Sequence, residues 1–130
     1  MDAKRRTETL VGAGLGLCVA AAAVALAWLD GGRGHVLRGI ANFLASLPVL
    51  AVWVLNGPEA LAFIFHFVYW AAVGGTLGWL GGRRGGAHRV AALVLVLGLA
   101  ASHWAAGVKL GREIEAAIRA VVMGLVGEGR

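Results

Sequence analysis

Long uncharged apolar runs dominate the chain, and short polar stretches separate them. Four runs stand out by length, at residues 10–29, 39–55, 60–80 and 90–108. An α-helix rises about 1.5 Å per residue, so about 20 apolar residues cross the hydrocarbon of a bilayer, which is roughly 30 Å thick. The pattern therefore predicts an all-α integral membrane protein, a single membrane domain with four transmembrane helices.

The run at residues 39–55 is the shortest, and Asn42, Ser46 and Pro48 interrupt it. Proline removes one helical hydrogen bond, and a membrane helix tolerates it where neighbours satisfy the freed carbonyl group. Three alternatives stay open for this run: a full span, a span kinked at Pro48, and a segment that enters the bilayer and returns.

Residues that typically end and start helices lie between the runs and support this division. The stretch from Asn56 to Glu59 reads Asn-Gly-Pro-Glu, which combines residues suited to a helix end with proline and an acid suited to the next helix start. Three basic residues at positions 4–6 precede the first run, as in a secretory signal. We expect this segment to be retained as a membrane anchor.

The tail at residues 109–126 has a different pattern. Its apolar residues recur at helical spacing, whereas charged residues cover the other face, and Glu115 and Arg119 form a favourable i,i+4 pair. This pattern predicts a C-terminal amphipathic helix that does not span the bilayer. It is expected to lie either on the membrane surface or against a partner protein.

Composition agrees with a lipid environment. Apolar residues make up 59% and charged residues 15% of the chain, against about 45–50% and about 25% in soluble domains. The net charge of +5 sits at the ends of the runs, which favours anionic lipid headgroups over nucleic acid as partners. Arg83, Arg84 and Arg89 are the expected headgroup contacts. Basic residues are almost balanced between the two sides, and we assign both termini to the cytoplasm.

Small residues recur every four positions in three of the runs. Such faces let helix backbones approach closely, which drives helix association in lipid. The pattern predicts packing within the chain, against other membrane subunits or against a flat cofactor. The residues concerned are Gly12 and Gly16 in the first run, Gly74, Gly78 and Gly82 at the end of the third, and Gly98, Ser102 and Ala106 in the fourth.

Two histidines, His66 and His103, lie inside the third and fourth runs, at nearly the same distance from the loop that joins them. Ionisable residues inside a span are costly and usually face the bundle interior. A depth-matched pair is compatible with haem b or a chlorophyll-type pigment held by one or both imidazoles. Hydrogen bonding between helices, contact with another subunit, and proton or ion handling are the alternatives.

Motifs for catalysis are lacking in this sequence: it has no Gly-Lys-Ser/Thr phosphate loop, no Cys-x-x-Cys and no His-Glu-x-x-His. We therefore expect a small non-catalytic membrane subunit, or an assembly or stabilising factor, of a larger membrane complex. A tetrapyrrole-binding subunit in electron or energy transfer is the first alternative. A homo-oligomeric pore or small carrier, lined by Asn42, Ser46 and Glu59, is the second.

Overall fold

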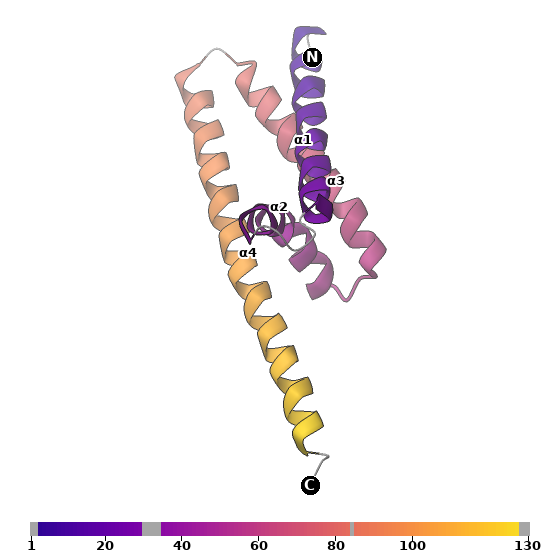
Figure 1. The fold of residues 1–130 in the computed structure, drawn as a ribbon. Coiled ribbons are helices and arrows are strands. Elements are labelled where there is room, and N and C mark those ends of the chain that lie inside the picture. Colours follow the sequence, from indigo (N-terminus) through magenta and orange to yellow (C-terminus); the bar gives the residue numbers. More distant parts are fainter. Residues whose placement is uncertain (1–2, 30–34, 84, 128–130) are drawn as a thin grey trace.

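The computed structural model describes residues 3–29, 35–83 and 85–127, and its elements are all helices. All four helices are long and apolar enough to cross a membrane, so by length and composition they fit the multi-pass helical architecture predicted from the apolar runs. In chain order they are α1 (Ala3–Leu29), α2 (His35–Val54), α3 (Glu59–Gly81) and α4 (Gly86–Gly127) (Figure 1).

The predicted break between α2 and α3 is confirmed. Asn56 adopts a left-handed conformation with φ of 49°, which is the ordinary way for a chain to leave a helix. The Gly57 N–H group then donates to the Val52 carbonyl at 2.9 Å. Pro58 caps the start of α3 in an extended conformation, so α3 begins at Glu59.

Helices α1 and α3 form the most extensive pair of the fold, and they run antiparallel. Early α1 lies against late α3, because Gly12 meets Gly74 and Gly78. Later α1 lies against earlier α3, because Gly16 meets Trp70 and the Ala20 carbonyl meets His66. The end of α1 is therefore beside the start of α3.

This direction determines the path of α2, which leaves and returns to the same end of the α1–α3 pair. Its middle nevertheless reaches the middle of the bundle, where the Trp70 side chain contacts Leu44. Four successive spans would make α1 and α3 parallel, so the structure differs here from the simple alternating path. Two glycine-rich helix faces can pack in a parallel or an antiparallel arrangement. The sequence alone does not determine which arrangement forms.

Helix α4 continues without interruption through residues 109–126, so the structure does not support a separate amphipathic helix there. The change in composition at Lys109 introduces no helix breaker, and the backbone simply continues. At about 1.5 Å per residue the helix is about 63 Å long, and its C-terminal part extends beyond the other helices (Figure 1). The predicted pair is confirmed: Arg119 Nη2 donates to Glu115 Oε1 at 2.5 Å.

Small side chains fill the interior, and large apolar side chains point outward. The buried apolar residues are mostly alanines, such as Ala20 and Ala23 of α1, whereas Leu15, Phe63 and Leu97 are more than half exposed. In water this distribution would be costly, but lipid solvates the outer side chains. Among the side chains that the structure describes, the buried polar ones are Ser46, His66 and His103.

Candidate functional site

His103 of α4 lies where α2, α3 and α4 meet, and its side chain is almost fully buried at 1% exposure. Its Nδ1 is 2.7 Å from the Phe43 carbonyl oxygen of α2. Its Nε2 is 2.9 Å from the Tyr69 hydroxyl of α3. One imidazole thus joins three helices through two short hydrogen bonds.

The partners of His103 determine its tautomer. A backbone carbonyl can only accept, so Nδ1 carries the proton and donates it to Phe43. Nε2 then holds the lone pair and accepts a hydrogen bond from the Tyr69 hydroxyl. The Ser46 hydroxyl completes the contact between α2 and α4, with the His103 carbonyl oxygen at 2.9 Å and the Phe43 carbonyl oxygen at 2.8 Å. Both ring nitrogens of His103 are therefore engaged within the chain.

Aromatic rings enclose the His103 imidazole. The Trp70 ring stacks on it with centroids 5.4 Å apart and planes 22° from parallel. The Phe43 ring lies 5.4 Å away and the Tyr69 ring 5.5 Å away. We refer to these residues together as the His103 cluster: Phe43, Ser46, Tyr69, Trp70 and His103.

Trp70 has a second function in this cluster, which follows from the proline in α2. Pro48 has no backbone N–H group, so the Leu44 carbonyl four residues earlier lacks its helical donor. The Trp70 indole Nε1–H donates to that Leu44 carbonyl at 3.1 Å. A side chain of α3 thus satisfies the carbonyl freed by proline in α2, and α2 remains helical from His35 to Val54.

The pairing of Trp70 with Pro48 predicts a measurable coupling. Trp70→Phe should cost about 1 kcal/mol in an otherwise unchanged chain, because it removes the only indole donor to Leu44. In a Pro48→Ala background the cost should fall by about half or more, because the introduced alanine supplies a backbone N–H. Unfolding in mixed detergent micelles measures the four stabilities.

Trp104 points outward from the helices and is 70% exposed, so it provides the matched control for this cycle. Trp104→Phe should show no coupling to Pro48→Ala. Equal costs of Trp70→Phe with and without Pro48 would contradict the assignment.

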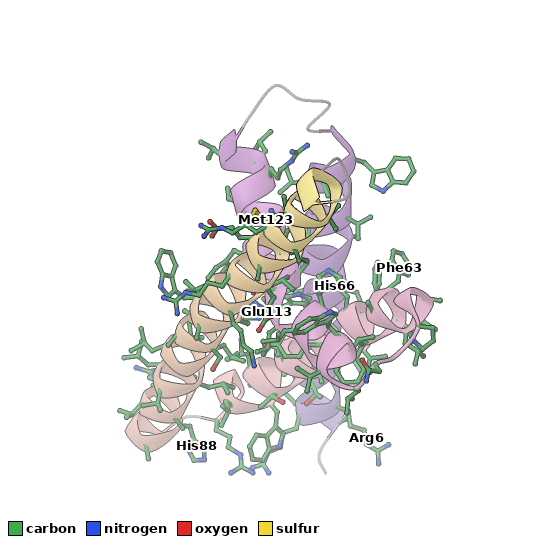
Figure 2. The ribbon with its side chains drawn as sticks, turned by 90° about the horizontal axis from the view of Figure 1, so that it is seen from below. Arg6, Phe63, His66, His88, Glu113 and Met123 are labelled. Atoms are coloured by element: carbon green, nitrogen blue, oxygen red, sulfur yellow. The ribbon has the colours of Figure 1, made fainter. Side chains whose placement is uncertain are left out.

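His66 of α3 is also buried, at 5% exposure, but its environment differs from that of His103. Its Nε2 is 3.3 Å from the Ala20 carbonyl oxygen of α1, so Nε2 carries the proton. Its Nδ1 is buried and has no hydrogen-bond partner within the part of the chain that the structure describes. The Phe67 ring contacts it edge-on at 5.8 Å. Figure 2 shows His66 among the helices, whereas Phe63 points away from them.

A cavity of about 320 Å³ adjoins His66 between α1, α2 and α3. Alanines from all three helices line it, including Ala23, Ala41 and Ala62. Asn42 is the second polar residue of the lining. The cavity is thus apolar, with one imidazole and one amide.

These contacts bear on the predicted tetrapyrrole. Iron ligation by His103 would require the loss of its bond to Tyr69 or to Phe43, whereas His66 Nδ1 retains an unused lone pair. No group of three or more histidines, cysteines and acids that could hold a metal ion occurs among residues 3–29, 35–83 and 85–127. Tetrapyrrole ligation stays a prediction, which a Soret band lost in His66→Ala would support.

No family model, curated protein or solved structure matches this chain. Its function is therefore argued from its own residues and contacts.

The glycines predicted to pack helices fall into two groups. A Cβ added to Gly12, Gly16, Gly74 or Gly78 would overlap backbone carbonyl oxygens of the opposing helix, and one on Gly82 would overlap the Glu8 carboxylate. These glycines therefore lie in the α1–α3 contact. In α4, by contrast, Ala106 is buried, whereas Gly98 and Ser102 are exposed.

Of the predicted headgroup arginines, Arg83 lies at the α3–α4 turn and Arg89 lies in the first turn of α4. Arg83 Nη1 donates to His88 Nε2 at 3.0 Å, and the Arg83 guanidinium lies 3.8 Å above the centre of the Trp79 ring. Arg89 is exposed, and Arg84 lies outside the described residues.

Sequence reasoning missed Tyr69 and Phe43 as partners of His103. One signal was present: Trp70 is the tryptophan farthest from the ends of the predicted spans, and Pro48 supplies a carbonyl in need of a donor. Of the predicted pore residues, Ser46 is buried in the His103 cluster and Asn42 lines the cavity beside His66. The Glu59 side chain lies outside the described part of the chain.

Proposed function

We propose that this chain is a small non-catalytic membrane subunit, or an assembly or stabilising factor, of a larger membrane complex. The main observation in support of this proposal is that α1 and α4 each have a face of small, exposed side chains. On α1 this outer face consists of Gly14, Cys18, Ala21 and Ala25, and on α4 of Gly98, Ala101, Ser102 and Ala105. Within the described chain, nothing lies within 4 Å of a Cβ added to Gly14 or Gly98.

Small exposed residues favour a helix over lipid as the neighbour. Lipid offers no preference for glycine, whereas a second helix gains close backbone packing from it. The chain uses the same device internally, where Gly12 and Gly16 of α1 pack against α3. The outer faces of α1 and α4 carry small residues of the same kind, but within the described chain nothing packs against Gly14 or Gly98.

The polar residues of the interior support a structural assignment as well. The His103 cluster uses its imidazole, hydroxyls and indole to join α2, α3 and α4. Because both His103 nitrogens bond to groups of other helices, the cluster supports a role in stabilising the arrangement of helices.

The C-terminal part of α4 is the second surface for a partner. Because it continues the helix line of a transmembrane segment, we propose that it projects from the bilayer instead of lying flat on it. Ile114, Ile118 and Val121 are each more than half exposed there. An apolar stripe on a projecting helix suits the groove of another subunit.

Orientation is part of the same proposal. We propose that the end of the molecule with Lys4, Arg5 and Arg6 is cytoplasmic, in line with the positive-inside rule. If α1, α3 and α4 cross the bilayer while α2 returns to its starting side, the C-terminal end of α4 lies on the opposite side. A cytoplasmic C-terminus requires α2 to cross as a fourth span.

Gly98→Leu is expected to reduce assembly of the complex about tenfold, because leucine on the outer face of α4 prevents close helix approach. Ala100→Leu is the matched control, since Ala100 is also exposed but lies on the other side of the helix. Blue-native electrophoresis of mildly solubilised native membranes measures the assembled fraction. Cys18→Leu tests the outer face of α1 in the same way. Full assembly in both face variants would contradict the proposal.

A further inference from the structure

The antiparallel packing of α1 and α3 brings two basic segments together that are far apart in sequence. The N-terminal turns of α1 meet the turn between α3 and α4, and a pocket of about 510 Å³ opens between them. Lys4 and Arg5 line it from α1, whereas Arg83 and His88 line it from the turn, together with Gly82 and Gly85. We refer to this as the basic pocket.

Two hydrogen-bond donors at the basic pocket lack an acceptor. Guanidinium nitrogens only donate, so the bond from Arg83 Nη1 makes His88 Nε2 the acceptor and leaves the His88 proton on Nδ1. Within the described residues, His88 Nδ1 and Arg83 Nε are both buried and have no hydrogen-bond partner. The lining of the pocket is basic and rich in donors, which suits a ligand that is anionic and rich in acceptors.

The charge balance of the basic pocket points the same way. Its described lining contains two arginines and a lysine and no carboxylate. Glu8 places its carboxylate against Gly82 and lines the neighbouring groove between α1 and α3. Basic side chains therefore outnumber carboxylates in the described lining of the pocket.

The position of the pocket identifies the source of the anion. The Trp79 ring lies under the Arg83 guanidinium, at the last turn of an apolar helix, and tryptophan is typical of the headgroup level of a bilayer. The basic pocket thus lies where lipid phosphates lie, between two transmembrane helices, and such pockets suit anionic headgroups.

We propose that the basic pocket formed by Lys4, Arg5, Arg83 and His88 binds the phosphate group of an anionic phospholipid and so fastens the start of α1 to the α3–α4 turn. The lipid phosphate accepts from the Arg83 guanidinium, and the Lys4 ammonium adds charge. This inference stands independently of the subunit proposal, because it concerns lipid and not protein partners.

The full chain in nanodiscs tests the proposal. Discs of phosphatidylcholine with a minor fraction of phosphatidylglycerol are compared by native mass spectrometry after gentle release of the protein. The unchanged chain should retain phosphatidylglycerol selectively. Lys4→Gln should lower the retention roughly fivefold, since one basic residue near the surface is lost, and Arg83→Gln should lower it further. Arg112→Gln, which removes an exposed charge of α4 elsewhere, should leave it unchanged.

Each other outcome overturns the inference. Equal retention in Lys4→Gln, Arg83→Gln and Arg112→Gln would show that the lipid binds elsewhere. Displacement of phosphatidylglycerol by millimolar inorganic phosphate would assign the basic pocket to a soluble phosphate instead of a lipid. Because Lys4 is exposed, its variant keeps the test valid even if Arg83→Gln unfolds.

Discussion

Gly74→Leu should separate α1 from α3 and lower the stability of the fold by about 3 kcal/mol or more. A Cβ at Gly74 already overlaps the Gly12 carbonyl oxygen, and backbone atoms in two packed helices cannot move aside as a flexible side chain would. The contact is the most extensive in the molecule, so its loss should also release α2, whose ends are tied to this pair. This is the largest single effect that we expect.

A disulfide reports this separation directly. A Cβ on Gly75 would lie 3.7 Å from the Ala13 Cβ, within the roughly 3.5–4.5 Å found between Cβ atoms of disulfides. In a Cys18→Ser background, the pair Ala13→Cys and Gly75→Cys should therefore oxidise readily. Adding Gly74→Leu should abolish the disulfide, whereas adding Gly98→Leu should leave it intact. Unchanged oxidation with Gly74→Leu would disprove the close α1–α3 contact.

The glycine faces illustrate how far the sequence alone reaches. A repeat of small residues every fourth position indicates close packing, but it carries no direction and no partner. Gly12, Gly16, Gly74 and Gly78 turned out to face each other, whereas Gly98 of the same type faces outward. Which small face is used internally depends on the path of the whole chain.

The helices themselves were predictable because lipid demands long apolar runs, and all four appear. Their connections were less so. The amphipathic change at Lys109 was read as a boundary, but polarity governs the environment of a helix and not its continuity, and α4 runs on to Gly127. Four alternating spans require α2 to cross the bilayer fully. The antiparallel α1–α3 pair instead fits the alternative in which residues 39–55 enter the bilayer and return.

For the two buried histidines as well, the sequence indicates their depth in the bundle but not the groups that they contact. The equal spacing of His66 and His103 from their shared loop suggested one site. Both are indeed buried, but they contact different helices, with His66 against α1 and His103 against α2. Each histidine donates to a backbone carbonyl group of another helix, and backbone carbonyls leave no signature in sequence.

This difference predicts unequal effects of one substitution at the two positions. His103→Leu should lower the stability by about 2–3 kcal/mol, because it removes two short hydrogen bonds and leaves the part-buried Tyr69 hydroxyl without its acceptor. His66→Leu should cost at most about 1 kcal/mol, because it breaks one bond of 3.3 Å and also removes a buried nitrogen without a partner. Unfolding in mixed micelles compares both variants with the unchanged chain.

Tyr69→Phe separates the two contributions at His103. Alone it should cost about 0.6–1.7 kcal/mol, the usual range of one hydrogen bond between membrane helices. Combined with His103→Leu it should restore part of the lost stability, because the orphaned hydroxyl is gone. Equal losses for His103→Leu and His66→Leu would mean that burial alone, and not the bonds to Tyr69 and Phe43, sets the contribution of each imidazole. Since Trp70 stacks on His103 and also donates to Leu44, a large loss at His103 would further indicate that α2 is held in the bundle through this cluster.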